Sequence, residues 1–167
     1  MVLSRMLQQS LNDQIRDELA SAYLYLAMSA YFEAENLPGF AHWMRVQAQE
    51  EVDHAMKIYR FVFDRGASVV LQALDQPAAA FSSPLDVFEQ ALEHERSITE
   101  KFHRLYAQAV EEKDYASIPL IEWFVTEQVE EEATAEHVME QLRRVGDAGH
   151  ALLMLDRELG ARQAAAQ

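Results

Sequence analysis

The sequence has no cysteine, only five glycines and four prolines in 167 residues, and few basic residues. Without cysteine, the chain can form no disulfide, no thiolate-bound zinc or iron–sulfur site and no cysteine nucleophile. With 14 Lys and Arg against 28 Asp and Glu, the formal net charge is −14. This charge disfavours nucleic acid as a partner, because such binding depends on neutralising phosphates. It is suited either to repulsion between molecules or to the attraction of cations.

Long hydrophobic runs are also missing. The longest nearly apolar run covers residues 23–32, whereas a membrane-spanning helix needs about 20 apolar residues. Residues 1–10 show no basic region followed by an apolar one, so we expect no secretory signal. Half of the residues are nevertheless hydrophobic, too many for a disordered chain, and the length is typical of one domain. We therefore expect residues 1–167 to form a single-domain cytoplasmic protein with no membrane association.

The few glycines and prolines separate long segments rich in Ala, Leu, Glu, Gln and Met, which favour helix. Helices are predicted over about 4–35, 38–65, 84–111, 115–145 and 148–160, with Pro119 delaying or kinking the start of the fourth. The first and third connections are short and predict antiparallel hairpins, whereas residues 66–83 are numerous enough to cross the length of a bundle. The predicted fold class is all-α: an antiparallel four-helix bundle with a long crossover between its second and third helices and a short fifth, C-terminal helix.

Each of the four long helices carries an apolar seam with spacings of three and four residues, and an acid interrupts each seam near its middle. The interrupting acids are Glu18, Glu51, Glu95 and Glu131, and the second and fourth seams also contain His54 and Gln128. A single seam glutamate is more often a solvated edge residue. Four carboxylates at one level, however, would repel one another and be costly to desolvate. Because a shared cation removes both problems, the pattern predicts a metal site inside the bundle.

The residue types indicate which metals suit the site. Glu51 and His54 lie one turn apart on one helix face. Mostly oxygen ligands with one nitrogen suit iron, manganese or related divalent ions. A carboxylate that bridges two metals is usual in dinuclear sites, and Glu51 has the central position. Tyr25 lies two turns from Glu18 on the same face, where it either donates a hydrogen bond or an electron to the site or is simply a half-buried core residue.

A second group of acids adjoins the first. Glu50, Glu127 and Glu130 either line an inner surface as an overflow or transit site for cations or belong to a solvated helix face. The predicted fifth helix contains the apolar run 152–155, which is too apolar for an exposed appendix and predicts packing against other subunits.

Four stretches of this sequence resemble prokaryotic non-haem ferritins of the ferritin-like di-iron superfamily, and the resemblance covers essentially the whole chain. The stretches are residues 18–25 (ELASAYLY), 49–55 (QEEVDHA), 94–95 (HE) and 123–132 (WFVTEQVEEE). The resemblance implies a homo-oligomeric hollow shell of 24 subunits with a di-iron ferroxidase centre inside each bundle. It assigns one iron site to Glu18, Glu51 and His54, and the second to the bridging Glu51 with Glu95, Gln128 and Glu131. It matches Glu50, Glu127 and Glu130, with Glu131 shared, to a third iron site, and Tyr25 to the tyrosine of the centre.

The activity implied by the resemblance is iron storage and detoxification. Fe(II) would be oxidised by O2 or peroxide, and the Fe(III) would enter the shell as a hydrated oxide mineral. The related bacterioferritins carry a histidine in place of Glu131 and a haem-binding methionine in place of Val52, so we expect no haem. Rubrerythrins add a cysteine-ligated iron domain, which this chain cannot form. The DNA-protecting mini-ferritins lack the fifth helix, and their basic tails are absent here.

Two other functions remain open on the sequence alone. One is a non-catalytic bundle that holds a static dinuclear metal as a structural element. The other is a di-iron peroxidase or oxidase that acts as a small oligomer.

Overall fold

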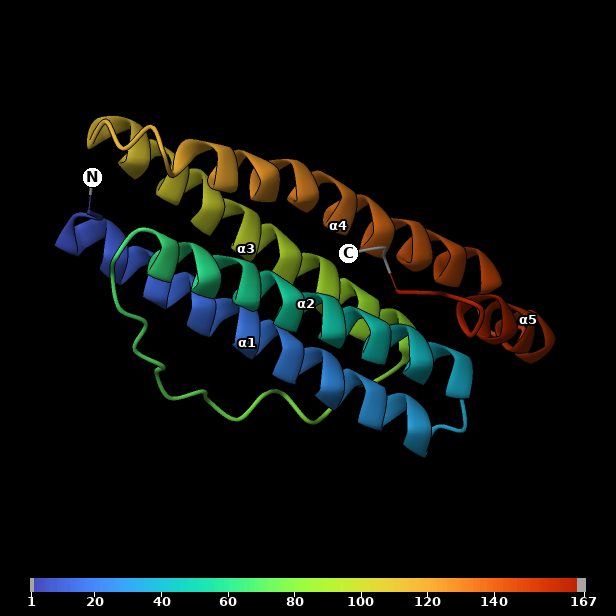
Figure 1. Ribbon diagram of the computed structural model, residues 1–167. Coiled ribbons are helices and arrows are strands. Elements are labelled where there is room, and N and C mark those ends of the chain that lie inside the picture. The colour runs from blue at the N-terminus through green and yellow to red at the C-terminus, as the bar shows by residue number, and fades with distance from the viewer. Residues whose placement is uncertain (1, 165–167) are drawn as a thin grey trace.

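Four long helices lie side by side, and a short fifth helix packs across one end of them in the computed structural model (Figure 1). Residues 2–164 are described, so residue 1 and residues 165–167 of the predicted domain lie outside the described part. The helices are α1 (Arg5–Ala34), α2 (Pro38–Asp64), α3 (Pro84–Glu111), α4 (Ile118–Val145) and α5 (Gly149–Leu159). Within residues 2–164, no helix is both long enough and apolar enough to cross a membrane.

The chain passes through the bundle as two antiparallel hairpins joined by a long crossover. The hairpins are α1 with α2 and α3 with α4, and residues 65–83 run back along α1 to bring the start of α3 beside the start of α2 (Figure 1). Polar side chains of α1 hold this crossover. Asn12 accepts a hydrogen bond from the Val70 amide (2.9 Å) and donates to the Ser68 carbonyl (3.2 Å). The crossover therefore has fixed partners although it contains no helix or strand.

Side-chain caps and prolines set the helix starts. The Ser4 hydroxyl accepts a hydrogen bond from the Leu7 amide, and Ser83 accepts one from the Asp86 amide. The fourth helix begins at Ile118, three residues later than the sequence suggested, and Pro119 stands in its first turn. A proline is tolerated there because the first amides of a helix have no intrahelical acceptor. Its ring therefore delays α4 and does not kink it.

The core consists of two apolar clusters, one toward each end of the bundle. One is built around Phe32, Phe40 and Phe88, and the other around Phe102 and Phe124. On every long helix, the residues of the two clusters are separated by a stretch that holds buried polar side chains. These are Glu18 and Ser21 on α1, Glu51 and His54 on α2, Glu95 on α3, and Gln128 and Glu131 on α4. The four seam acids therefore form one polar layer across the middle of the bundle.

Helix α5 is held against the start of α2 by Gly39 and Asp156. The Asp156 carboxylate accepts a hydrogen bond from the Phe40 amide (3.0 Å) and so caps α2, whose own N-cap residue, Leu37, offers no side-chain acceptor. A Cβ atom at Gly39 would lie 1.7 Å from the Asp156 carbonyl oxygen, so this approach requires a glycine. Leu155 and Leu159 face the bundle and are buried.

Candidate metal centre

The middle layer contains two overlapping groups of metal-ligating atoms. Glu18, Glu51 and His54 form the first, and Glu51, Glu95 and Glu131 form the second; within each group the ligand atoms lie within 4.8 Å of one another. All five side chains are buried. Because Glu51 belongs to both groups, its carboxylate is placed where it can bridge two ions. Helices α1, α2, α3 and α4 each contribute a ligand, so only the folded bundle assembles the site.

Two buried atoms of the first group lack the partners that buried polar atoms normally have. Among the described residues, Glu18 Oε2 and His54 Nδ1 make no hydrogen bond. The two atoms lie 3.3 Å apart, and Nδ1 is 3.6 Å from Glu51 Oε2. Two carboxylate oxygens and one imidazole nitrogen thus converge on one point, and this donor set fits Fe(II) or a similar divalent ion.

Buried carboxamides hold the opposite oxygens of these carboxylates. Gln14 donates to Glu18 Oε1 (2.7 Å), and Gln47 donates to both Glu51 Oε1 (2.9 Å) and Glu131 Oε2 (2.7 Å). Each contact occupies one oxygen and leaves the other for a metal, which is the usual role of residues behind metal ligands. Sequence reasoning assigned no role to Gln14 or Gln47. The available signal was their position four residues before Glu18 and Glu51, one helical turn away on the same face.

Glu95 is held from two sides. The Tyr25 hydroxyl donates to Glu95 Oε1, and the Gln128 amide donates to Oε2 (3.1 Å). The amide oxygen of Gln128 is therefore the atom of that side chain that could bind a metal. Tyr25 is fully buried and not half-buried as one reading expected: its ring packs in one apolar cluster, while its hydroxyl reaches Glu95.

Burial and crowding change the protonation of these groups. Burial raises the pKa of Glu51 to about 7, against the lowering effect of His54. Burial, followed by the charge of Glu51, raises the pKa of Glu95 to about 8, and the pKa of Glu131 is raised for the same reasons. Burial alone would lower the pKa of His54, but the Glu18 and Glu51 carboxylates hold it at about 11. Without a cation the layer therefore retains protons at neutral pH, and binding a cation would release them.

The three acids predicted to form a second group, Glu50, Glu127 and Glu130, do not all meet at one site. Glu127 joins His54 and Glu131 in a third ligand group at the edge of the layer. Glu50 forms an ion pair with Arg162 (2.7 Å), and Glu130 is exposed on α4. Among the described residues, neither Glu50 nor Glu130 belongs to a ligand group.

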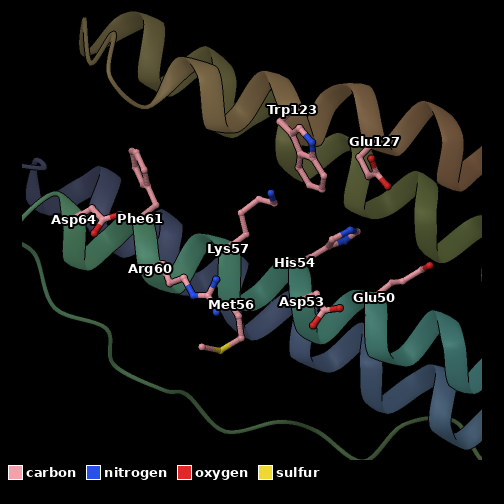
Figure 2. Close-up of a pocket in the computed structure, with 10 residues that line it drawn as sticks. All are labelled: Glu50, Asp53, His54, Met56, Lys57, Arg60, Phe61, Asp64, Trp123 and Glu127. Atoms are coloured by element: carbon pink, nitrogen blue, oxygen red, sulfur yellow. The ribbon is translucent and has the colours of Figure 1, made fainter. Parts of the chain in front are cut away.

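A pocket of about 550 Å³ between α2 and α4 leads to this edge. Figure 2 shows His54 and Lys57 of α2 reaching toward Trp123 and Glu127 of α4. The Lys57 ammonium lies 4.1 Å from the centre of the Trp123 ring. His54 and Glu127 belong both to the pocket wall and to the third ligand group, so the pocket adjoins the edge of the layer.

Residues 8–145 match the family model described as "Ferritin: Ferritin-like domain". The chain belongs to the ferritin family. It is 42% identical over 161 residues to the bacterial non-heme ferritin of Staphylococcus aureus (strain USA300), covering 96% of this chain and 97% of that protein. The bacterial non-heme ferritin of Bacteroides fragilis (strain 638R) is also 42% identical, with 96% and 100% covered.

Solved ferritins share the fold as well. An open pore ferritin from the hyperthermophilic archaeon Archaeoglobus fulgidus is 48% identical and superimposes with a TM-score of 0.96, covering 96% of this chain and 99% of that one. A closed form of the same ferritin, engineered by site-directed mutagenesis, is 47% identical, with a TM-score of 0.96 and 98% and 99% covered. The ferritin fold predicted from the sequence is thus confirmed, and the family supports iron storage as the function.

Proposed function

We propose that each subunit is a ferroxidase that oxidises Fe(II) at a di-iron centre in the middle layer. The observation that carries the proposal is the pair of buried atoms Glu18 Oε2 and His54 Nδ1, which make no hydrogen bond within the described residues and lie beside the shared Glu51 carboxylate. One Fe(II) would be bound by Glu18, Glu51 and His54. The other would be bound by Glu51, Glu95 and Glu131, with the amide oxygen of Gln128 within reach of this second position. The two ions are substrates that enter and leave.

The residues of the centre also bind and release protons. Fe(II) binding displaces the protons that Glu51 and Glu95 retain at neutral pH. Two Fe(II) then lose one electron each, and one O2 accepts both electrons with two protons to give hydrogen peroxide. With peroxide as oxidant, the same two electrons and two further protons give two waters. The Tyr25 hydroxyl donates to Glu95 and keeps that carboxylate oriented, whether a proton or an iron ion balances its negative charge.

A third ion is proposed at the edge of the layer, bound by Glu127 and Glu131 beside His54. Glu50 and Glu130 would reach this ion only by turning toward it, since neither belongs to the ligand group in the described structure. The pocket between α2 and α4 offers the route for ferric ions to leave the bundle. No part of this scheme needs haem, and Val52 supplies no sulfur ligand for one.

The product would be stored in a shell of 24 subunits. The bulky apolar residues Leu153 and Met154 are exposed on α5, at 53% and 59%, and contact with neighbouring subunits would cover them. The net charge of −14 per chain would make an enclosed cavity strongly attractive to Fe(II). Native mass measurement tests the number of subunits.

Replacing the shared carboxylate tests the enzyme directly. Glu51→Ala should abolish the fast phase of Fe(II) oxidation after anaerobic protein and Fe(II) are mixed with oxygenated buffer, while the mass of the particle stays the same. Glu93→Ala, at an exposed position of α3, is the matched control and should oxidise Fe(II) as the parent does. A fast phase that survives in the Glu51→Ala particle would overturn the assigned centre.

A further inference from the structure

The segment that follows α5 places Arg162 against the face of α2 that carries the metal layer. Its guanidinium Nη2 donates to Glu50 Oε2 (2.7 Å) and to Gln47 Oε1 (2.9 Å). The guanidinium carbon lies 4.3 Å from the centre of the Trp43 ring, a cation–π contact. The carbonyl oxygen of Arg162 pairs with His42 Nε2 (2.8 Å). Arg162 is therefore held by four residues of α2, and its side chain is 19% exposed.

The contact with Gln47 fixes the direction of a buried amide. Because the Gln47 carbonyl accepts from Arg162, its NH2 group must point the other way, toward Glu51 and Glu131. If the amide turned over, its NH2 group would face the guanidinium and its oxygen would face two carboxylates, and both contacts would be repulsive. Arg162 is thus connected through one side chain to two of the proposed iron ligands.

The contact with Glu50 holds a positively charged guanidinium against this carboxylate, which lies next to the layer. A guanidinium stays protonated at every working pH, and charge-assisted hydrogen bonds to a carboxylate are among the stronger ones. A divalent ion that needed Glu50 as a ligand would have to displace this cation. If Arg162 stays on Glu50, Glu127 and Glu131 have to bind the ion without that carboxylate.

We propose that Arg162 is a positioning residue that aims the Gln47 amide at Glu51 and Glu131 and, by occupying Glu50, keeps a third divalent ion weakly bound. This inference rests on the proposed di-iron centre. It makes the third position a transit point, because an ion there competes with a cation that belongs to the chain. It also gives the segment after α5 a direct influence on the centre, although its partners on α2 lie 112 to 120 residues earlier in the sequence.

Binding of Zn(II) to the assembled, metal-free protein tests the inference without any redox step. Isothermal titration should show two tightly bound ions per subunit and a third bound more weakly. In Arg162→Gln, the third ion should bind about tenfold more tightly, the change expected when one charge-assisted hydrogen bond no longer competes. Arg104→Gln, at an exposed position of α3, should leave all three ions unchanged.

Two further variants separate competition for Glu50 from a general effect on folding. Arg162→Lys keeps the positive charge beside Glu50 and should keep the third ion weak. In the double variant Glu50→Gln with Arg162→Gln, the third Zn(II) should bind as weakly as in the parent. The Glu50 carboxylate that Arg162→Gln makes available to the ion is missing in this variant. Equal affinity for the third ion in the parent and in Arg162→Gln would overturn the role of Arg162 alone. A parent protein that binds no pair of ions would overturn the di-iron centre, and this inference with it.

Discussion

The Gln14 carboxamide donates to Glu18 Oε1 over 2.7 Å, while the other oxygen of Glu18 faces His54 Nδ1 at 3.3 Å. One side of the carboxylate is therefore occupied by the protein, and the other is left for a cation. The amide nitrogen can only donate, so this contact fixes one oxygen of Glu18 and turns the other toward His54.

Removing this donor should weaken the first iron position. Gln14→Met keeps the length of the side chain but leaves Glu18 Oε1 without a partner, and we expect metal affinity at that position to fall about tenfold. The measurement is anaerobic titration with Fe(II) or Zn(II). Gln9→Met is the matched control, because Gln9 donates to the partly exposed Asp13 with the same four-residue spacing on the same helix. Equal loss of affinity in both variants would show that the contact of Gln14 with Glu18 has no special role.

The metal-free protein should become less stable as the pH rises. The folded state holds the Glu51 and Glu95 protons up to pH values of about 7 and 8, whereas an ordinary glutamate loses its proton near pH 4.5. The folded state therefore binds more protons than the unfolded state across this interval, and the free energy of unfolding falls as pH increases through it. The raised pKa of His54 acts in the same direction above pH 6.5.

Melting temperatures measured from about pH 5 to 8 should therefore decline without metal, and Zn(II) should reverse the decline because a bound cation takes the place of the protons. Glu95→Gln removes one of the titrating groups and should flatten the curve. Glu93→Gln, at an exposed position two residues earlier, should leave the slope as it is. A melting temperature of the metal-free protein that rises over this range would contradict the proposed protonation of the layer.

The docking of α5 should fail when Gly39 gains a side chain. A Cβ atom there would lie 1.7 Å from the Asp156 carbonyl oxygen, so α5 must move away from α2 and the Asp156 cap on the Phe40 amide is lost. We expect Gly39→Ala to destabilise the protein by about 1–3 kcal/mol, a typical cost of overpacking. Thermal unfolding measures this loss. Gly149→Ala is the control, because a Cβ atom at Gly149 meets no other atom within 4 Å; similar losses in both variants would show that the close approach is unimportant.

The sequence predicts the helices and the buried polar layer well for one physical reason. Helical spacing fixes which residues share a face, so a glutamate that interrupts an apolar seam can be located without knowing the neighbouring helices. The short hairpin connections then bring Glu18 to the level of Glu51, and Glu95 to the level of Glu131. The exact start of α4 was less accessible, because several residues before Pro119 have reasonable helix propensity and only the turn that precedes Ile118 decides among them.

The surroundings of the centre could not be predicted in the same way. Gln14 lies one helical turn before Glu18, but this spacing alone does not show whether its side chain is buried or solvated. Glu50 is also uninformative by itself, because its partner, Arg162, follows the last helix and reaches α2 only through the docking of α5. Contacts of this kind depend on tertiary structure, and no local spacing rule reports them.

The middle layer divides the apolar core of the subunit into two parts. A layer of buried polar side chains separates these parts, so each half of the bundle has its own apolar packing and the two halves meet through this layer. A bound pair of cations would join them into one cooperative folding unit. We therefore expect ions bound in this layer to stabilise both halves of the bundle together.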